Sequence, residues 1–209
     1  MRVTPHSSWL FTGDSITDAG RVRHAADDLG DGYVRRIAAR GAASDERPTV
    51  RNTGVAGDRA VDLRARWEAD AIAHGPTVLT VLVGVNDMWR RYDSDDPTPA
   101  EAFADHYRAI LTRTRAALPD SRIVLMEPFL LPVTLEQERW LREDLREKQA
   151  ITRALADQAG ADFISLQSSL ASHAETHGAA RIAEDGVHPT AAGHDLIADR
   201  WWRTIGERA

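Results

Sequence analysis

Short apolar runs alternate along the chain with longer segments in which apolar residues recur at helical spacing. The apolar runs predict strands at Ser8–Thr12, Thr49–Asn52, Thr77–Val83, Arg122–Glu127 and Asp162–Leu166. The longer segments predict helices near Tyr33–Arg40, Asp58–Ala73, Pro99–Ala117, Leu135–Ala159 and Ala191–Ile205. This repeated alternation is typical of an α/β fold with an open parallel sheet and helices on both faces. In such folds the carboxyl ends of the strands meet at one edge, where ligands bind.

Two of the predicted helices carry patterns that indicate how they pack. In the last one, Ile197, Trp201 and Ile205 form a stripe that should face the core. Trp202 lies about 100° around that helix from Trp201. Its side chain could form a subunit contact or a second wall of the pocket, or it could have no specific role. Opposite charges three or four residues apart along Leu135–Lys148 predict a solvated helix face rather than a binding patch.

Composition narrows the class of protein. The 209 residues include no cysteine, which excludes a disulfide scaffold, a thiol nucleophile and a Cys-ligated metal centre. A net charge of −6 argues against nucleic acid as the main partner. No apolar run approaches the ~20 residues of a membrane span. The length fits one domain over residues 1–209. The polar start Met1–Ser8 does not resemble a signal peptide, so we expect a cytoplasmic protein.

Two glycine-containing segments follow the first two predicted strands. In Thr12–Asp18, Gly13 permits a tight turn that would present Ser15 at the carboxyl edge of the sheet. Taken alone, this segment fits a helix cap better than a nucleophile. After the second strand, Gly54 and Gly57 can expose backbone N–H groups to an anion. A phosphate loop is the competing interpretation, but the lysine and the spacing of a Walker motif are missing.

Two further segments carry an asparagine and a histidine. Asn86 follows the most apolar strand and can direct an amide N–H toward the sheet edge, although it could be an ordinary turn residue. Pro189 disfavours helix at His188, which should therefore lie in a loop at the start of the last helix. Asp185 can fold back to accept a hydrogen bond from its ring. A lone histidine suggests a structural role, but a carboxylate within orienting range favours a catalytic one.

Taken together, these segments predict a hydrolase site. Serine is a weak nucleophile until a base removes its proton, and His188 would be that base for Ser15. Asp185 would hold the imidazole tautomer and stabilise the imidazolium. The backbone N–H groups of Ser15 and Gly57 and the side-chain amide of Asn86 would receive the developing oxyanion. In other enzymes one such donor is worth roughly 3 kcal/mol of transition-state stabilisation.

The four segments resemble, in order, the four sequence blocks of the GDSL, or SGNH, hydrolase family. The matching residues are Gly13-Asp14-Ser15, Gly57, Gly84-Val85-Asn86-Asp87 and Asp185-Gly186-Val187-His188. This resemblance implies a flavodoxin-like, three-layer α/β/α sandwich with a five-stranded parallel sheet. By position, it implies that Ser15 is nucleophile and oxyanion donor, that Gly57 and Asn86 are the other donors, and that Asp185 and His188 complete a triad. Gly57 directly precedes Asp58, as the family pattern requires, which leaves Gly54 as the turn residue.

Three longer stretches are similar to bacterial acetylxylan esterases of this family. They are Phe11–Arg21, Asp62–Asp70 and Gly84–Asp93. This narrower likeness implies a carbohydrate deacetylase. We therefore expect Asp14, beside the nucleophile, and Trp89, shortly after Asn86, to contact the substrate. For Trp89 the alternatives are stacking on a sugar and packing beneath the Asn86 loop.

The sequence thus predicts a serine esterase that removes short acyl groups, above all acetyl, from carbohydrate oxygen through an acyl-enzyme. The reaction requires no metal and no organic cofactor. The alternatives are a broader esterase, a thioesterase or a lysophospholipase on the same machinery, and a non-catalytic module that binds a small ligand. We expect a small-molecule ester as substrate, no nucleic-acid or membrane partner, and a homo-oligomer.

Overall fold

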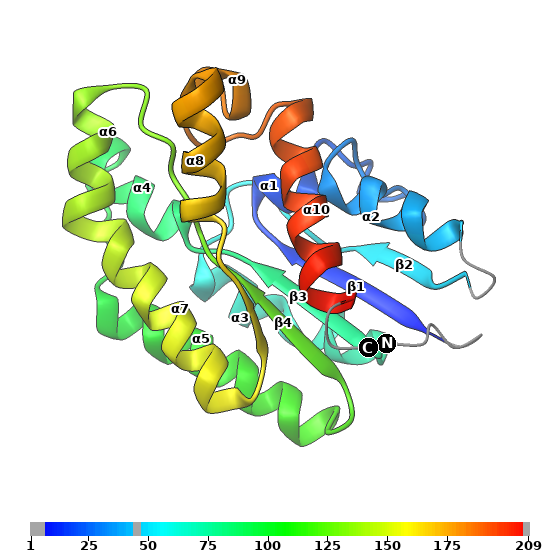
Figure 1. Ribbon diagram of the computed structural model, residues 1–209. Helices are drawn as coiled ribbons and strands as arrows, with labels where there is room; N and C mark the ends of the chain where they lie inside the picture. The colour runs from blue at the N-terminus through cyan, green and yellow to red at the C-terminus, as the bar shows by residue number, and fades with distance from the viewer. Residues whose placement is uncertain (1–6, 44–46, 207–209) are drawn as a thin grey trace.

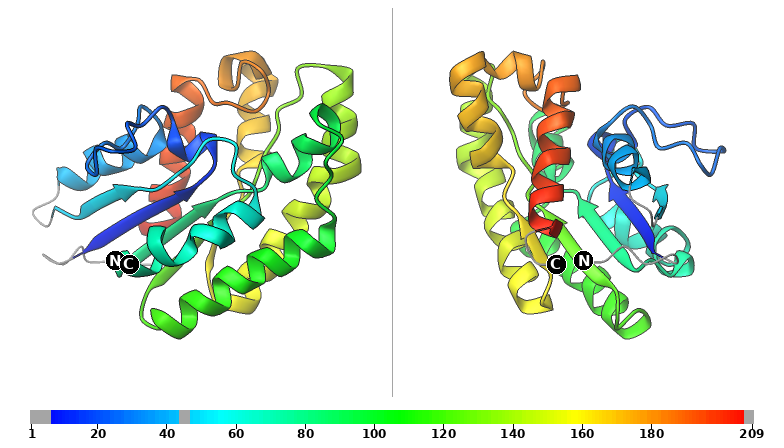
Figure 2. Two further views of the ribbon diagram at one scale, coloured as in Figure 1. Left: turned by 180° about the vertical axis from the view of Figure 1, so that it is seen from behind. Right: turned by 45° about the vertical axis from the view of Figure 1, so that its right-hand side comes forward.

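The computed structural model describes residues 7–43 and 47–206. Residues 1–6, on which the expected cytoplasmic location rests, lie outside the described residues. Figure 1 shows a twisted sheet that crosses the molecule with helices packed against it. Figure 2 shows the same layers from behind and from the side.

The sheet has five parallel strands, as the sequence predicts. They are β1 (Ser8–Gly13), β2 (Thr49–Asn52), β3 (Val78–Leu82), β4 (Arg122–Met126) and β5 (Asp162–Ile164). Their order is β2-β1-β3-β4-β5, and every neighbouring pair is parallel. The chain reverses its direction of travel across the sheet between β2 and β3, which places a topological switch point at the carboxyl end of β1. The predicted α/β sandwich is confirmed.

Each face of the sheet is covered by its own set of helices, because side chains alternate along β1. Trp9 and Phe11 point to one face and Leu10 to the other. The helices that match predictions are α2 (Tyr33–Ala42), α3 (Ala60–Asp70), α5 (Ala100–Ala117), α7 (Arg146–Ala159) and α10 (Ala191–Gly206). Helices α2 and α10 lie in front of the sheet in Figure 1, whereas α3 and α5 come forward in the reversed view of Figure 2.

The helix predicted over Leu135–Ala159 is formed by α6 (Leu135–Trp140), η2 (Leu141–Leu145) and α7 in succession. The structure contains further short helices that the sequence pattern did not predict. They are α1 (Ser15–Asp18), η1 (Ile72–His74), α4 (Val85–Asp93), α8 (Gln167–His177) and α9 (Ala179–Ile182). Helices α1 and α4 begin directly after β1 and β3. Both therefore start at the carboxyl edge of the sheet, where their first turns can contribute to a site.

Helix α10 packs as its pattern predicts. Ile197 and Trp201 are fully buried and Ile205 almost so. The Trp201 indole N–H donates a hydrogen bond to Thr80 Oγ1 on β3 at 3.0 Å. Trp202 lies edge-on to Trp9, with 5.7 Å between the ring centroids. Trp202 thus packs against the start of β1 within this chain.

The expectation of a wholly solvated face over Leu135–Lys148 is wrong at its end. Lys148 is only 2% exposed and forms an ion pair with Asp144, which is also buried and receives Arg91 at 3.3 Å. The cause is the π-helical turn η2. Its wider winding changes which residues face inward. The two charges tolerate burial because each has an opposite charge as its partner.

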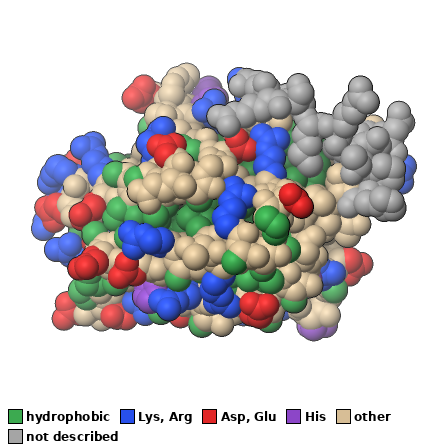
Figure 3. All heavy atoms as spheres, turned by 90° about the horizontal axis from the view of Figure 1, so that it is seen from below, with side chains coloured by type: hydrophobic (Ala, Val, Ile, Leu, Met, Phe, Trp, Pro, Cys, Tyr) green, Lys and Arg blue, Asp and Glu red, His purple; other side chains and the backbone are tan. Residues whose placement is uncertain are grey.

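The molecular surface is of mixed charge on the face seen from below. Figure 3 shows acidic and basic side chains interspersed there, with hydrophobic side chains between them. None of the helices within the described residues combines the length and the hydropathy that crossing a bilayer would require.

Candidate active site

Ser15 lies at the tip of β1 because the backbone turns sharply at Gly13. Gly13 has a φ of +154°, and a Cβ at this position would lie 1.9 Å from the carbonyl oxygen of Leu82 on β3. Only glycine fits so close to the neighbouring strand. Asp14 then caps α1 by accepting a hydrogen bond from the N–H of Ile16 at 3.0 Å. Ser15 is therefore not the helix cap but the first residue of the helix.

His188 is held in the loop between α9 and α10, as predicted. Oδ1 of Asp185 accepts hydrogen bonds from the N–H groups of Val187 and His188 at 2.9 and 2.7 Å. Gly186, with a φ of +84°, allows the turn between them. Gln137 of α6 donates from Nε2 to the carbonyl oxygen of Asp185 at 2.7 Å. The sequence analysis did not identify Gln137, because nothing in its own segment indicates a contact with this loop.

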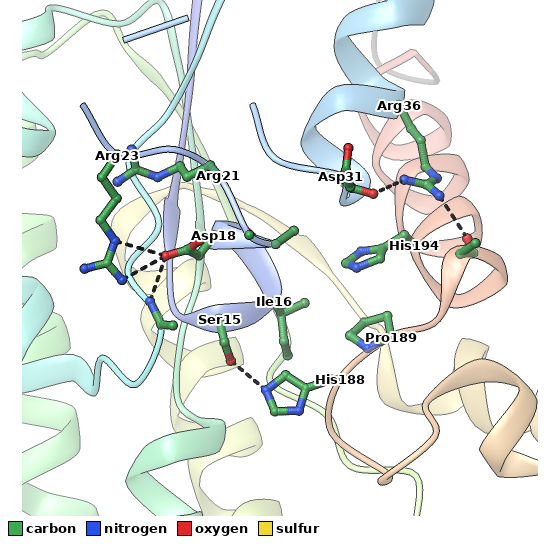
Figure 4. Close-up of a pocket in the computed structure, with 14 residues that line it drawn as sticks. Ser15, Ile16, Asp18, Arg21, Arg23, Asp31, Arg36, His188, Pro189 and His194 are labelled. Atoms are coloured by element: carbon green, nitrogen blue, oxygen red, sulfur yellow. Dashed lines mark hydrogen bonds and ion pairs between the residues drawn. The ribbon is translucent and has the colours of Figure 1, made fainter. Parts of the chain in front are cut away.

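The structure brings Ser15, His188 and Asp185 into one hydrogen-bonded chain. Ser15 Oγ lies 3.0 Å from Nε2 of His188, and Nδ1 of His188 lies 2.7 Å from Oδ2 of Asp185. Figure 4 shows the serine hydroxyl directed at the His188 ring. A carboxylate at Nδ1 favours the tautomer that carries its proton there. Nε2 is then free to accept the serine proton.

The hydrogen-bonded triad of Ser15, His188 and Asp185 lies at the protein surface. The side chains of His188 and Asp185 are 47% and 46% exposed. Partial burial raises the pKa of Asp185, but hydrogen bonds from the His188 N–H, the His188 ring and the Val187 N–H outweigh it. The pKa therefore lies below its ordinary value, and Asp185 is ionised wherever His188 is needed as a base.

Each of the three predicted oxyanion donors has a proton without an acceptor among the described residues. The N–H of Ser15 is in the first turn of α1, where no helical acceptor exists. The N–H of Gly57 has no partner among the described residues, and Gly57 is exposed with a φ of +91°. Asn86 donates one amide proton to the carbonyl oxygen of Asp58 at 3.0 Å, and its second amide proton remains available.

Gly54 and Gly57 lie in the same loop between β2 and α3, but their N–H groups differ in hydrogen bonding. The Gly54 N–H already donates to Oδ1 of Asn52 at 2.9 Å. A Cβ on Gly54 would lie 2.5 Å from the backbone nitrogen of Asp18. Gly54 is thus required by close packing against α1, and its N–H is occupied. Gly57 sits between Ala56, which lines the pocket beside Ser15, and Asp58, which binds Asn86.

A pocket of about 780 Å³ opens beside Ser15 and His188. Its wall is formed by α1, the loop after it and the first turns of α2 and α10. The charged and titratable residues on this wall are Asp18, Arg21, Arg23, Asp31, Arg36 and His194. Asp18 is bound by Arg23 at 3.0 Å and by the N–H of Ala56 at 3.1 Å. The pocket wall thus combines charged and hydrogen-bonding groups with apolar side chains such as Ile16 and Pro189.

Asp14 does not reach this pocket, which corrects the expectation that it contacts the substrate. Its side chain is 1% exposed, because it points behind α1 to cap the helix. Burial raises the pKa of Asp14 to about 7, the N–H of Ile16 opposes the rise, and Asp87 and Asp58 add to it. Oδ2 of Asp14 has no hydrogen-bond partner within the described part of the chain.

Trp89 lies against His188 rather than in the pocket wall. The two ring centroids are 5.8 Å apart, and the planes are tilted by 52°. Trp89 is half-buried and packs on the hydrophobic core below its helix. This placement favours the packing alternative, in which Trp89 packs against the imidazole of His188.

A serine hydroxyl bound to an imidazole that is itself bound to a carboxylate can be deprotonated as it attacks an electrophile. Nearby N–H groups without partners can stabilise the negative oxygen that such an attack creates. The arrangement is suited to acyl transfer.

Comparison with known proteins agrees with this chemistry. The GDSL-like lipase/acylhydrolase family model matches residues 11–196. An acetylxylan esterase of Geobacillus stearothermophilus is 32% identical over 217 residues, which covers 99% of this chain and 97% of that protein. A crystal structure of an acetylxylan esterase from that organism has a TM-score of 0.89 at 30% identity, with 99% and 97% of the two chains covered. A Parabacteroides merdae protein assigned to the GDSL-like lipases has a TM-score of 0.93 at 32% identity, over 98% of both chains. Two further structures of the Geobacillus esterase are catalytic mutants, one at a serine and one at a histidine.

Proposed function

Because the chain belongs to the GDSL-like lipase/acylhydrolase family, we propose that it is a serine esterase that removes acetyl groups from carbohydrate oxygen. Family membership and the full-length similarity to an acetylxylan esterase make it a carboxylic ester hydrolase. The observation that carries the proposal is the hydrogen-bonded Ser15–His188–Asp185 triad beside an open pocket.

In the first half of the reaction Ser15 Oγ attacks the ester carbonyl carbon while Nε2 of His188 takes the serine proton. The C–O bond to the sugar then breaks, and His188 returns the proton to the leaving oxygen. In the second half a water molecule attacks the acyl-enzyme with His188 again as base. Acetate and the free Ser15 hydroxyl are the products. Asp185 remains ionised and stabilises the imidazolium in both halves.

The negative oxygen of each tetrahedral intermediate is assigned to the N–H groups of Ser15 and Gly57 and the amide of Asn86. This assignment is supported because each of these groups has a proton without an acceptor among the described residues, whereas the Gly54 N–H already donates to Asn52. Preorganised donors of this kind are effective because they need no rearrangement as the charge develops.

The carbohydrate part of the proposal is supported by the pocket and by the relatives. The relatives of known activity act on acetylxylan and acetyl-xylooligosaccharide. The pocket is far larger than an acetyl group and is lined by side chains that hydrogen-bond well to hydroxyl groups, such as Asp18, Arg21 and Asp31. Hydroxyl groups of a sugar can add hydrogen bonds to these side chains, and an alkyl chain cannot.

The test is a substrate panel with Ser15→Ala as the control. We expect fast release of acetate from acetylated xylo-oligosaccharides, with p-nitrophenyl acetate cleaved faster than p-nitrophenyl octanoate. A clear preference for the octanoate would support the broader esterase or lysophospholipase alternative instead. An organophosphonate should label Ser15 once per chain, and folded protein that is not labelled would support the non-catalytic binding module.

Other expectations are not addressed by these observations and stay predictions. They are one hydrolase domain over residues 1–209, a cytoplasmic location, a homo-oligomeric state, and the lack of a nucleic-acid or membrane partner. The contact of Trp202 with Trp9 gives that side chain a role within the chain, so it supplies no argument for a subunit interface.

A further inference from the structure

A second histidine, His194, lies on the wall of the active-site pocket, six residues after His188. It belongs to the first turn of α10 and is 9% exposed. Figure 4 shows its ring on the side of the pocket formed by Pro189 and Arg36, across from Arg21 and Arg23. The mechanism described above does not use it.

The tautomer of His194 is fixed by a backbone donor. The N–H of Tyr33 at the start of α2 donates to Nδ1 of His194 at 3.2 Å. A backbone N–H can only donate, so Nδ1 must be without a proton. In a neutral imidazole the proton is then on Nε2. Nε2 has no acceptor among residues 7–43 and 47–206, and the ring borders the pocket.

The orientation of this ring is fixed by its neighbours. The Tyr33 ring is stacked against it, with 6.4 Å between centroids and 26° between planes. The hydroxyl of Tyr33 is in turn bound to Oγ1 of Thr17 at 2.9 Å, two residues after the nucleophile. Gly32 leaves just enough room, since a Cβ there would lie 3.0 Å from Cε1 of His194. The ring is thus coupled to the turn that carries Ser15.

His194 is neutral under ordinary conditions. Burial, together with the neighbouring Arg36 and His188, lowers the pKa of His194 to about 4, and Asp195 opposes the shift only in part. The Nε2–H is therefore a neutral donor throughout the range in which an esterase dependent on a histidine base works.

We propose that the Nε2–H of His194 donates a hydrogen bond to an oxygen of the substrate's alcohol part and thereby selects esters of polyhydroxylated alcohols. This proposal rests on the proposed esterase function. The pocket is too large for an acetyl group alone, so it receives the alcohol part. The donor is fixed in orientation and borders the pocket, and no acceptor among the described residues pairs with it, so a hydroxyl or ring oxygen of the substrate can do so. A plain alkyl group supplies none and leaves the donor unpaired.

Two substitutions separate this role from a structural one. His194→Asn places an amide oxygen where Nδ1 stands, so the Tyr33 N–H keeps its acceptor, but the Nε2–H is lost. His194→Gln extends an amide NH2 toward the position of Nε2 and loses the Nδ1 acceptor instead. The substrates are glycerol monoacetate and propyl acetate, which share the acetyl group and a three-carbon alcohol and differ in the hydroxyl groups.

We expect His194→Asn to lower kcat/KM for glycerol monoacetate about tenfold, mainly through KM, and to change that for propyl acetate less than twofold. His194→Gln should keep most of the wild-type preference for the hydroxylated ester. Equal losses on both esters in His194→Asn, or an unchanged preference, would overturn the proposal. Urea unfolding of each variant shows whether it is folded at the assay temperature.

This result is independent of the natural substrate. If the wild-type enzyme cleaved both small acetates but not acetylated xylo-oligosaccharides, the proposed carbohydrate substrate would be wrong. The ratio of the two small acetates would still decide the role of His194.

Discussion

At the active-site edge one carboxylate and one imidazole lie at the surface, and a second residue of each kind lies beneath it. The outer residues are Asp185 and His188, about half exposed. The inner residues are Asp14, which is buried behind α1, and His194, which is buried under Tyr33. Each outer residue binds the other, whereas each inner residue accepts a hydrogen bond from a backbone N–H at a helix start.

The pKa values of the two carboxylates are shifted in opposite directions. Hydrogen bonds hold the pKa of Asp185 below its ordinary value, and burial raises that of Asp14 to about 7. Burial lowers the pKa of His194 to about 4. Burial therefore disfavours the charged form of the inner carboxyl and of the inner imidazole, whereas hydrogen bonds favour the charged form of Asp185.

The largest effect is expected from His188→Ala. Removal of the base should lower kcat on every ester by roughly 10⁴- to 10⁶-fold, as for other serine hydrolases. The free energy of unfolding should change little, because His188 is half exposed. Initial rates on p-nitrophenyl acetate measure the loss. A comparable loss in His194→Asn would mean that the inner histidine takes part in the chemistry and would break the comparison.

The next effect is expected from Asp185→Asn. An amide cannot hold the Nδ1–H tautomer, so kcat should fall by about 10⁴-fold. The same chemical change at the inner acid, Asp14→Asn, should cost less than about tenfold, because the buried side chain does not reach the pocket and an amide oxygen can still accept from the Ile16 N–H. Similar losses in the two variants would show that Asp14 takes part in the chemistry.

A third expectation concerns stability and pH. In the unfolded chain Asp14 titrates near 3.8, and in the folded protein its pKa is about 7. Between these values the folded state binds the proton more tightly, so the free energy of unfolding falls as pH rises from about 4 to 7. The full loss is on the order of 4 kcal/mol.

Asp14→Asn keeps the acceptor for the Ile16 N–H and removes this titration, so its stability should decline less over that window. Urea unfolding at several pH values measures the difference. Asp27→Asn, at an exposed position, is the matched control. Parallel curves for wild type and Asp14→Asn would show that Asp14 is ionised in the folded protein.

The smallest expected effect is a difference in stability between His194→Gln and His194→Asn. Gly32, which caps α2, has no side chain, and the ring of His194 supplies the acceptor that the helix start needs. His194→Gln should therefore lose about 1 kcal/mol of stability, and His194→Asn should lose less. Thermal unfolding of the two variants side by side tests this order, and the reverse order would be inconsistent with the assigned tautomer.

Much of this arrangement could be predicted from the sequence because it is local. The five strands follow from apolar runs, and Asp185 and His188 are three residues apart. The outcome for Asp14 could not be predicted, since its position beside Ser15 says nothing of the face to which its side chain points. Helix α4 was missed because its first turn, Val85–Met88, is buried at the end of a strand and looks like a loop.

His194 and Gln137 illustrate the other limit. Their partners, Tyr33 and the carbonyl oxygen of Asp185, lie 161 and 48 residues away in the sequence. No pattern within a single segment can indicate such contacts. The buried ion pair of Lys148 and Asp144 was hidden for a related reason, since a π-helical turn departs from the spacing on which a helical pattern is judged.

The glycine that ends β1 has a consequence for anyone who redesigns this enzyme. Any other residue at position 13 would put a carbon atom into the Leu82 carbonyl of the adjacent strand. Libraries that aim at new substrates can therefore vary the distant wall, including Arg21 and Arg36, but should hold this one codon constant. The lack of a side chain at position 13 thus allows the turn that places Ser15, and no other residue can take the place of glycine there.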